Sequence, residues 1–492
     1  MPNTTHTRLP PMSTGIEGLD DILHGGLSPN RMYLVEGVPG SGKTTLGMQF
    51  LAAGARNGER VLYVTLSESL DELHDIADSH GWSLDGISVR ELIPSENSLN
   101  PDDQYTVFHP SEIELTETTS QILRDVEEQK PSRLVFDSLS ELRLLAGSPL
   151  RYRRQILALK QFFAGRGCTV ILLDDLTATD RDLQVQSISH GVFALEQLLP
   201  EYGSARRRLR VVKFRGKVFR GGYHDYAIRS GGLDVFPRLV AAEHRGEASG
   251  GELASGNTAL DALLGGGIEF GSSTLLMGPP GAGKSTLTAQ FVSAAAERGV
   301  KSAMFIFDES VNTLLARARG LNIELAKHVD AGLVKIQPVD PAELSPGEFG
   351  QIIRRAVEKH GARVIVIDSL NGYLNATPEE RFLTIQLHEL LAYLGQRGVA
   401  TFIVGAHQGL IGGSMSGPVD ASYLADGVVL LRFYEIHGEV RQAISVVKKR
   451  GGAHERTIRD FRLTSDGIQI GEPLRRFRGV LTGVPIPLDT EN

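Results

Sequence analysis

The stretch Gly37-Val38-Pro39-Gly40-Ser41-Gly42-Lys43-Thr44 has the glycine spacing of a phosphate-binding loop. It follows an apolar run at 32–35 and precedes a helix-like run at 46–55. Closely spaced glycines let consecutive backbone N–H groups turn toward phosphates, and the helix that follows adds its positive end. Lys43 can then reach the β- and γ-phosphates, and the Thr44 hydroxyl can ligate Mg²⁺. This stretch predicts a strand, loop and helix that bind Mg-ATP.

The chain repeats this pattern as Gly278-Pro279-Pro280-Gly281-Ala282-Gly283-Lys284-Ser285, again between an apolar run (273–276) and a helix-like run (287–298). One match could be a glycine turn that binds no nucleotide, but two matches in the required context indicate two nucleotide sites. The residues expected to contact nucleotide are Gly37, Val38, Pro39, Gly40, Ser41, Gly42, Lys43, Thr44, Thr45, Gly278, Pro279, Pro280, Gly281, Ala282, Gly283, Lys284, Ser285 and Thr286.

Each half also contains an apolar strand that ends in aspartate. Asp137 closes the run 134–137, and Asp368 closes the run 364–368. They stand 94 and 84 residues after the loop lysines, counted from 43 to 137 and from 284 to 368. Continuous apolar runs favour a parallel sheet buried on both faces, and a carboxylate at such a strand tip faces the phosphate loop. We expect both aspartates to hold the Mg²⁺ shell, together with Thr44 and Ser285.

A third duplicated motif is Lys-x-Arg-Gly near the end of each half. It places Lys213 with Arg215, and Lys448 with Arg450. Residues i and i+2 of a strand share a face, so the two cations of each pair should project together. One interpretation is a solvated sheet edge protected by charge. The other is a charged finger that reaches a γ-phosphate bound by a neighbouring subunit.

Composition and charge describe an ordinary globular chain of 492 residues, long enough for two or three domains. The net charge of −8 gives no electrostatic reason to expect non-specific nucleic-acid binding. The single cysteine, Cys168, precedes a buried-strand pattern and is expected to be a core thiol in a reducing compartment. No apolar run reaches the roughly 18 residues of a membrane span, and the polar start resembles no signal peptide. These features predict a cytoplasmic protein without membrane association.

The order of the motifs indicates duplication. A short helix ended by glycines opens each half, at 12–27 and at 254–267, and Ser13 or Thr14 is expected to cap the first of them. Each half then has a further apolar strand (169–173 and 400–404) and a section that is typical of β-hairpins. We therefore expect an N-terminal domain at 1–242, a linker at 243–252, a C-terminal domain at 253–478 and a short tail at 479–492.

Together with the element Gly81-Trp82-Ser83-Leu84, these motifs resemble the clock-protein KaiC family from about Ser13 to about Gly483. The resemblance implies an α/β fold of two tandem RecA-like P-loop domains, each a mainly parallel sheet flanked by helices with C-terminal β-hairpins. It also implies a double-ring homohexamer that holds ATP and Mg²⁺ between subunits, a slow ATPase in the first domain, and an autokinase in the second. KaiB-like or sensor-kinase signalling partners fit this picture. The short tail argues against binding of a KaiA-type activator.

The family's paired catalytic glutamates correspond here to Ser67-Glu68 and Asp308-Glu309. Serine cannot act as a carboxylate base, so hydrolysis in the first half depends on Glu68 or on water held by other groups. Asp308 is one methylene shorter than glutamate, which moves a base back by about 1 Å. Glu68, Asp308 and Glu309 are the predicted catalytic carboxylates, and the Lys-x-Arg pairs are predicted to act across the subunit interface.

The family's adjacent Ser-Thr phosphoacceptors correspond to Ser422-Tyr423. Ser422 keeps a hydroxyl and remains a candidate for single-site autophosphorylation, although it can equally cap a turn. The Ser-Tyr pair argues against a two-site cycle.

Three functions remain open. The leading one is a hexameric ATPase with serine autokinase activity that works as a regulatory or timing switch. The second is a RecA- or helicase-type DNA motor, since fold does not settle function; its best support is Arg206-Arg207-Arg208-Leu209-Arg210, although no interleaved aromatic stripe accompanies this cluster. The third is a non-catalytic, ATP-dependent signalling scaffold, which Ser67 makes credible for the first half.

Overall fold

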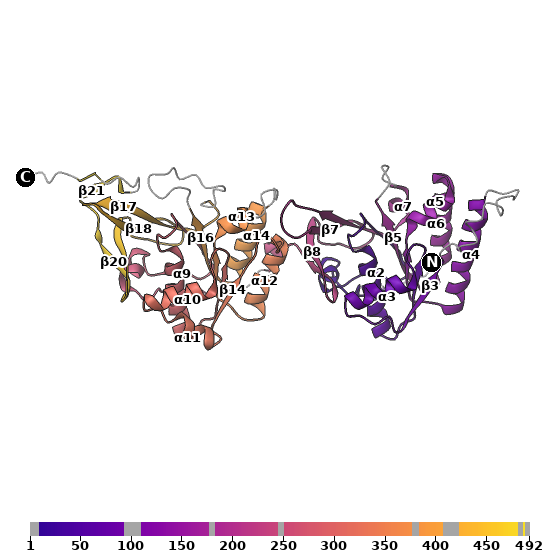
Figure 1. The fold of residues 1–492 in the computed structure, drawn as a ribbon, viewed down its shortest axis with the longest axis horizontal. Helices are drawn as coiled ribbons and strands as arrows, with labels where there is room; N and C mark the ends of the chain where they lie inside the picture. Colours follow the sequence, from indigo (N-terminus) through magenta and orange to yellow (C-terminus); the bar gives the residue numbers. More distant parts are fainter. Residues whose placement is uncertain are drawn as a thin grey trace, which may run out of the picture. The chain divides into compact units, whose positions relative to one another are not determined.

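The computed structural model describes residues 9–92, 110–176, 183–244, 250–375, 383–406, 423–480 and 486–487. The chain divides into two compact units, Met1–Arg238 and Leu239–Asn492. Figure 1 shows that each unit is built on its own sheet. The short helix η3 (Ala241–His244) belongs to the second unit, where the backbone N–H of Ala241 donates to Glu389 at 2.9 Å.

The sheet of the first unit has the strand order β3-β2-β4-β5-β1-β6-β7-β8-β9. It is parallel from β3 to β6 and antiparallel from β6 to β9. Its strands are β1 (Met32–Gly37), β2 (Val61–Thr65), β3 (Ile87–Glu91), β4 (Arg133–Asp137), β5 (Thr169–Asp175), β6 (Gly191–Leu198), β7 (Arg206–Phe214), β8 (Tyr223–Arg229) and β9 (Gly232–Phe236).

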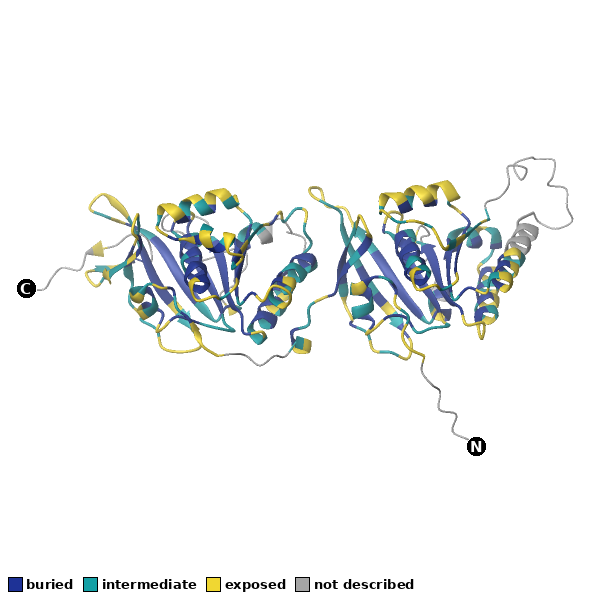
Figure 2. Cartoon of the chain, turned by 90° about the horizontal axis from the view of Figure 1, so that it is seen from below, coloured by how far each residue is buried: buried dark blue, intermediate teal, exposed yellow. Residues whose placement is uncertain are grey.

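Helices cover both faces of this sheet. Its described helices are α1 (Glu17–Ile22), α2 (Lys43–Arg56), α3 (Leu70–Ser79), α4 (Pro110–Gln129), α5 (Leu139–Ala146), α6 (Pro149–Phe163) and α7 (Leu183–Ile188). Alternate strand residues point to opposite faces, so two separate cores form. One packs α1, α2 and α3 against Tyr33 and Tyr63, and the other packs α4 to α7 against Leu34 and Leu62. Figure 2 shows the resulting buried strands between partly exposed helices.

The second unit repeats the arrangement with the strand order β14-β13-β15-β16-β12-β17-β18-β19-β20. The strands of the second unit are β10 (Glu252–Leu253), β11 (Ile268–Glu269), β12 (Ser273–Gly278), β13 (Ser302–Ile306), β14 (Val334–Pro338), β15 (Val364–Asp368), β16 (Ala400–Ala406), β17 (Gly427–Ile436), β18 (Glu439–Lys449), β19 (Arg459–Thr464), β20 (Gly467–Pro473), β21 (Phe477–Arg478) and β22 (Ile486–Pro487). The predicted fold class, two mainly parallel α/β sheets with C-terminal antiparallel hairpins, is confirmed.

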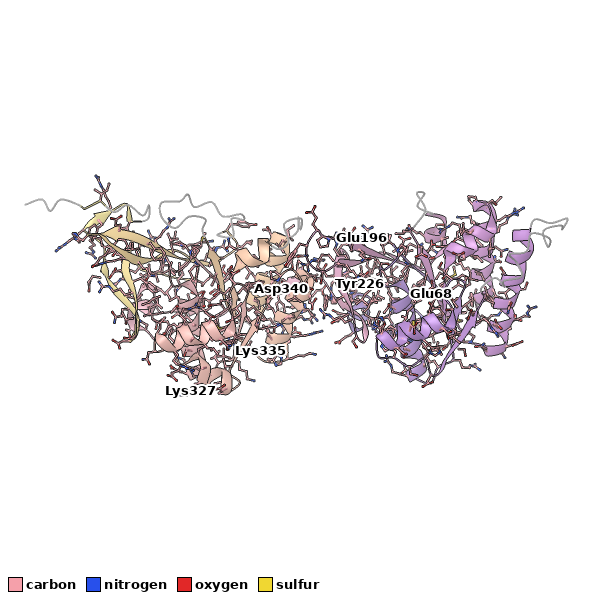
Figure 3. The ribbon with its side chains drawn as sticks, in the orientation of Figure 1. Glu68, Glu196, Tyr226, Lys327, Lys335 and Asp340 are labelled. Carbon is pink, nitrogen blue, oxygen red and sulfur yellow. The ribbon has the colours of Figure 1, made fainter. Side chains whose placement is uncertain are left out.

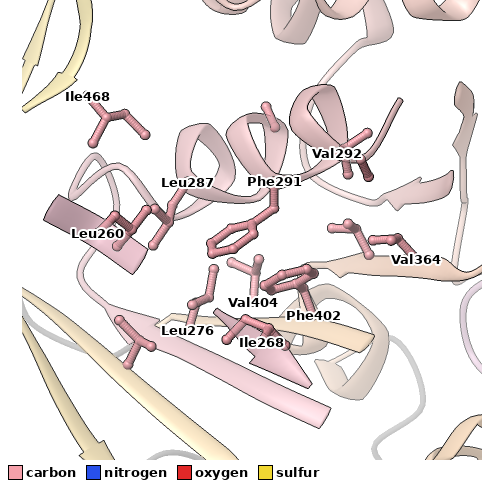
Figure 4. Packing of buried hydrophobic residues seen from close by; sticks show 14 of the residues in the cluster. Leu260, Ile268, Leu276, Leu287, Phe291, Val292, Val364, Phe402, Val404 and Ile468 are labelled. Atoms are coloured by element: carbon pink, nitrogen blue, oxygen red, sulfur yellow. The ribbon is translucent and has the colours of Figure 1, made fainter. Parts of the chain in front are cut away.

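Most helices of the second unit occupy corresponding places in the chain. The helices of this unit are α8 (Thr258–Leu263), α9 (Lys284–Glu297), α10 (Val311–Gly320), α11 (Leu325–Asp330), α12 (Pro346–Glu358), α13 (Leu370–Asn375) and α14 (Leu383–Gln396). The helix α11, between α10 and β14, has no counterpart among the described helices of the first unit. Figure 4 shows how α9 packs on the sheet: the ring of Phe291 points from the helix toward Phe402 and Val404 of β16. The rings of Phe291 and Phe402 are 4.9 Å apart, in one continuous apolar core.

The cap predicted for the first short helix is wrong. The N-cap of α1 is Ile16, and no side chain caps it. The hydroxyls of Ser13 and Thr14 instead donate to the carboxylate of Asp20, at 2.5 and 2.7 Å. Asp20 competes successfully for these hydroxyls because an ionised acceptor makes a stronger hydrogen bond than a backbone group.

Two further features concern the interior and the tail. Cys168 is buried, as predicted, and burial raises the pKa of its thiol to about 12. In the tail, β21 pairs with β22, and Val480 is buried against Tyr434 and Ala443. Among the described residues, no helix combines the length and apolarity needed to cross a bilayer.

Candidate active sites in the two halves

Each phosphate loop connects a central strand to a helix, β1 to α2 and β12 to α9. Gly42 and Gly283 lie directly before these helices with φ of 89° and 99°, a left-handed conformation that favours glycine. Both helices begin at the loop lysine, three residues before the predicted helical runs, so their first N–H groups belong to the loop. In the first half, the Tyr226 hydroxyl (Figure 3) donates to the carbonyl of Ser41 at 2.6 Å and ties the loop to β8.

The two loop lysines are buried and lie in different electrostatic surroundings. Lys43 Nζ donates to the carbonyl of Val38 at 3.1 Å and forms an ion pair with Asp175 at 2.7 Å. Lys284 Nζ donates to the carbonyls of Gly278 and Pro279, at 2.7 and 2.8 Å. Burial lowers the pKa of Lys284 to about 8. Sequence reasoning missed Asp175, because the predicted strand stops at Leu173, whereas β5 continues to Asp175.

The predicted metal-binding residues of each half lie together. Thr44 Oγ1 donates to Asp137 Oδ2 at 2.8 Å, and the Tyr63 hydroxyl donates to the same oxygen at 2.6 Å. Burial raises the pKa of Asp137. In the second half Ser285 hydrogen-bonds to Asp368, whose pKa burial raises to about 6.

These groups fit Mg²⁺, which prefers oxygen ligands and takes one or two carboxylates plus substrate phosphates. Asp368 Oδ2 is buried without a hydrogen-bond partner, so it has an unused lone pair that a cation could take. No cluster of three or more His, Cys, Asp or Glu within the described ranges forms a self-sufficient metal site. The donor set therefore suits a metal that arrives with nucleotide phosphates.

Glu68, labelled in Figure 3, lies within hydrogen-bonding distance of Thr44 in the first half. Its Oε1 accepts from Thr44 Oγ1 at 3.4 Å, and its Oε2 is buried without a partner. Burial, followed by the charge of Asp137, raises the pKa of Glu68 to about 7. A carboxylate with this pKa can accept a proton at neutral pH, which suits a general base.

The two predicted acids of the second half lie differently from Glu68 and from each other. Asp308 Oδ2 accepts a 2.5 Å hydrogen bond from Ser369, the residue after Asp368. Glu309 is held in a bidentate pair by Arg317, with both distances 2.7 Å. Both acids therefore lie near the metal-binding strand: Asp308 bonds to the residue after Asp368, and the charge of Glu309 contributes to the raised pKa of Asp368. Sequence reasoning missed Arg317, whose position in α10 corresponds to Ile76 in α3.

The Lys-x-Arg pairs each converge on one segment of backbone, as their spacing predicts. Lys213 and Arg215 both donate to the carbonyl of Ser187. Lys448 donates to the carbonyl of Ala425, and Arg450 reaches the carbonyl of Tyr423 and the carboxylate of Asp426.

The sheet register places each pair far from its own phosphate loop. In the first half, β6 begins at Gly191, which pairs with Tyr33 near the start of β1, whereas the loop follows Gly37 at the end of β1. Lys213 pairs with Val192 at that same starting edge, and Lys448 pairs with Val428 at the equivalent place in the second half. The pairs are therefore at the opposite sheet edge from their own loops.

The predicted phosphoacceptor Ser422 lies outside the described residues.

The arginine cluster of β7 is engaged within the sheet. The guanidinium groups of Arg208 and Arg210 lie over the ring of Tyr223, 5.0 and 5.1 Å from its centroid. The Tyr223 hydroxyl donates to Glu196 (Figure 3) at 2.9 Å. Arg208 and Arg210 therefore pack on an aromatic ring of the same sheet.

The Glu68 environment gives a pH-dependent prediction. The pKa of Glu68 is about 7 in the folded protein, above its ordinary value of 4.5. The charged carboxylate therefore increasingly destabilises the fold as the pH rises from 4.5 through 7. Glu68→Gln should therefore stabilise the first unit by about 1–2 kcal/mol at pH 8, after allowance for solvent screening, and the gain should disappear as the pH falls toward 4.5. Urea unfolding followed by fluorescence of Trp82, the chain's single tryptophan, measures this in EDTA without nucleotide. An equal gain at every pH would contradict the assignment.

Duplicated phosphate loops, each with a strand-end aspartate beside its Ser or Thr, define a tandem P-loop nucleotide-binding protein with RecA-like α/β units. The ATPase family KaiC matches residues 12–240 and again residues 253–475. The chain therefore belongs to the KaiC family of ATPases.

Several known proteins are similar over nearly the full length. The circadian clock oscillator protein KaiC of Thermostichus vulcanus is 28% identical over 484 residues, which cover 97% of this chain and 92% of the relative. The circadian clock oscillator protein KaiC of Synechococcus elongatus is 28% identical, with 98% and 93% covered. The circadian clock protein KaiC3 of Synechocystis is 25% identical, with 96% and 94% covered.

Proposed function

We propose that each half binds Mg-ATP at its phosphate loop and hydrolyses it, and that the protein works as a homohexameric regulatory switch. The observation that carries the proposal is the Thr44 hydroxyl, which lies 2.8 Å from Asp137 and 3.4 Å from Glu68. This juxtaposition combines metal ligands with a partly neutralised carboxylate beside a phosphate loop. Membership of the KaiC family supports ATP as the substrate.

The residues of the first half have separate roles in phosphate binding, metal binding and proton transfer. The loop N–H groups and Lys43 bind and orient the phosphates, while Thr44 and Asp137 hold the metal. Bound Mg²⁺ supplies charge neutralisation at the phosphates. Glu68 accepts a proton from the attacking water. Because Ser67 has no carboxylate, Glu68 alone performs this step in the first half.

In the second half, Lys284, Ser285 and Asp368 take the corresponding roles, and Asp308 is the base. Glu309 is neutralised by Arg317 and positions the adjacent backbone. Asp308 can activate water or a protein hydroxyl, and Ser422 is the candidate hydroxyl for autophosphorylation.

Assembly completes both sites. Since each Lys-x-Arg pair lies at the opposite sheet edge from its own loop, it can act only at the loop of a neighbouring subunit. Arranged head to tail, such contacts generate a closed ring. Because the relatives are circadian clock proteins, we propose a regulatory output, with KaiB-like or sensor-kinase proteins as the partners.

The deciding experiment incubates purified protein with Mg²⁺ and γ-labelled ATP, and follows free phosphate and protein-bound label. Wild type should release phosphate, Lys43→Ala and Lys284→Ala should each remove the contribution of one half, and Ser422→Ala tests the phosphoacceptor. Label lost in both Lys284→Ala and Ser422→Ala supports the autokinase. Phosphate release without retained label identifies an ATPase switch, and intact ATP-dependent assembly without turnover identifies a scaffold.

A further inference from the structure

Asp175 stands at the edge of the sheet where the first nucleotide site is proposed. It ends β5, which lies between β4, whose last residue is Asp137, and β1, whose last residue begins the phosphate loop. Asp175 is paired in register with Gly37, the first residue of the loop. Its Oδ1 is 2.7 Å from Lys43 Nζ, and the lysine side chain is 7% exposed.

The second half provides an internal comparison because its register is the same. There, Gly278 pairs with Ala406, so alanine occupies the position of Asp175. Lys284 satisfies its hydrogen bonds with backbone carbonyls of its own loop. The first half therefore carries a carboxylate on its loop lysine, whereas no ion pair with Lys284 is seen within the part of the second half that the structure describes.

A neighbouring acid does not share this role. Asp174 is paired with Arg143 at 2.6 Å, so its charge is compensated. Asp175 forms the 2.7 Å ion pair with Lys43. Its Oδ2 also accepts a 3.5 Å hydrogen bond from the Ser140 hydroxyl, and its backbone N–H donates to that hydroxyl at 3.3 Å. The charge of Asp175 is thus directed at the lysine that is proposed to bind phosphate.

We propose that Asp175 disfavours binding of the γ-phosphate in the first half. The ratio of ATP affinity to ADP affinity is therefore lower in the first half than in the second. The inference rests on the proposed function. A phosphate oxygen and an Asp175 oxygen that share one tetrahedral ammonium group lie about 4.5 Å apart, since each charge-assisted bond is about 2.8 Å long. At this separation like charges repel. ATP carries one more negative charge than ADP in total, and its β- and γ-phosphates, which Lys43 is expected to reach, together carry more charge than the β-phosphate of ADP, so ATP is penalised more.

The chain contains a built-in reporter for the first half. Its single tryptophan, Trp82, packs against the core of the first unit, so tryptophan fluorescence follows unfolding of this unit in the full-length protein. A ligand that binds the native state raises the unfolding midpoint according to its concentration and dissociation constant. The midpoint shift measured with Mg-ATP and with Mg-ADP therefore yields both affinities of the first half without any assay of turnover.

The test compares wild type with Asp175→Ala, which copies the second half, and with Asp175→Asn, which keeps the size of the side chain. Both variants should bind ATP about tenfold more tightly, and ADP threefold more tightly or less. Ala406→Asp is the matched control, because it should leave the Trp82 transition with either nucleotide unchanged.

The outcomes separate this inference from the proposal on which it rests. Equal tightening toward ATP and ADP, no tightening, or weaker ATP binding in Asp175→Asn overturns the role of Asp175 while nucleotide binding stands. A wild-type transition that neither nucleotide moves overturns nucleotide binding by the first half, and with it both proposals.

Discussion

Arg215→Ala is expected to lower ATP turnover of the first half by about 10³-fold or more, while ATP binding by that half persists. The reason is positional. Arg215 lies at the sheet edge opposite its own phosphate loop, so it is proposed to stabilise transition-state charge on a nucleotide held by another subunit. Arg450→Ala is the equivalent change in the second half. Turnover is measured as phosphate release in a Lys284→Ala background for Arg215, and in a Lys43→Ala background for Arg450.

A mixing experiment distinguishes action between subunits from a structural effect. Arg215→Ala subunits keep a complete phosphate loop, and Lys43→Ala subunits keep the arginine. When the two are mixed, with Lys284→Ala present in both, some interfaces join an intact loop to an intact arginine, and turnover should reappear. Arg215→Lys serves as a control that keeps the charge but loses the planar fork. Full turnover by Arg215→Ala alone would contradict the assignment.

Arg133→Ala is expected to destabilise the first unit by about 3–5 kcal/mol. Arg133 is 2% exposed and forms a bidentate pair with Glu59 at 2.7 and 2.8 Å. It also donates to the carbonyls of Ser13 and Phe50, at 2.8 and 2.9 Å. Alanine would leave these acceptors without their donor and open a cavity. Urea unfolding followed by Trp82 fluorescence measures the loss.

The neighbouring Gly54 allows a sharper version of this test. A Cβ on Gly54 would lie 2.6 Å from Arg133 Cδ, so Gly54→Ala should cost about 1–3 kcal/mol by overpacking. The second half has Ala295 at the matching place, eleven residues after its loop lysine as Gly54 is after Lys43. In an Arg133→Val background the cost of Gly54→Ala should fall, although part of it should remain because the added Cβ would also lie 2.8 Å from Val61 Cγ1. An unchanged cost would show that the arginine does not set this requirement.

The fold could be predicted from the sequence because its signals are local and duplicated. Continuous apolar runs gave the parallel strands, and glycine spacing placed the two loops between strand and helix. The absence of a side-chain cap on α1 could not be predicted. It depends on which group the Ser13 and Thr14 hydroxyls bond to, and Asp20 becomes their neighbour only after the turn forms.

The candidate sites could be predicted only where a motif has fixed spacing or an apolar strand ends in aspartate. The loops have such spacing, while Asp137 and Asp368 are recognised because each closes a continuous apolar strand. Asp175 and Arg317 have neither signal, because the first depends on pairing between β5 and β1, and the second on the direction in which α10 presents its side chains. The sequence also predicted similar catalytic roles for Glu68, Asp308 and Glu309. In the structure Glu309 differs in forming a bidentate ion pair with Arg317. The roles of these residues remain predictions.

The buried Arg133 also has a consequence for folding, because a duplicated chain must keep the strands of one half out of the sheet of the other. Two sheets with the same strand order invite exchange of equivalent strands, a characteristic failure of repeated architectures. Position 133 in β4 corresponds to Val364 in β15, since each is the first residue of its strand and pairs with the start of the neighbouring one. If β15 entered the first sheet, Glu59 would lose its cation; if β4 entered the second, a guanidinium would be buried without a carboxylate. The mismatched interiors thus penalise both exchanges and direct each strand to its own half.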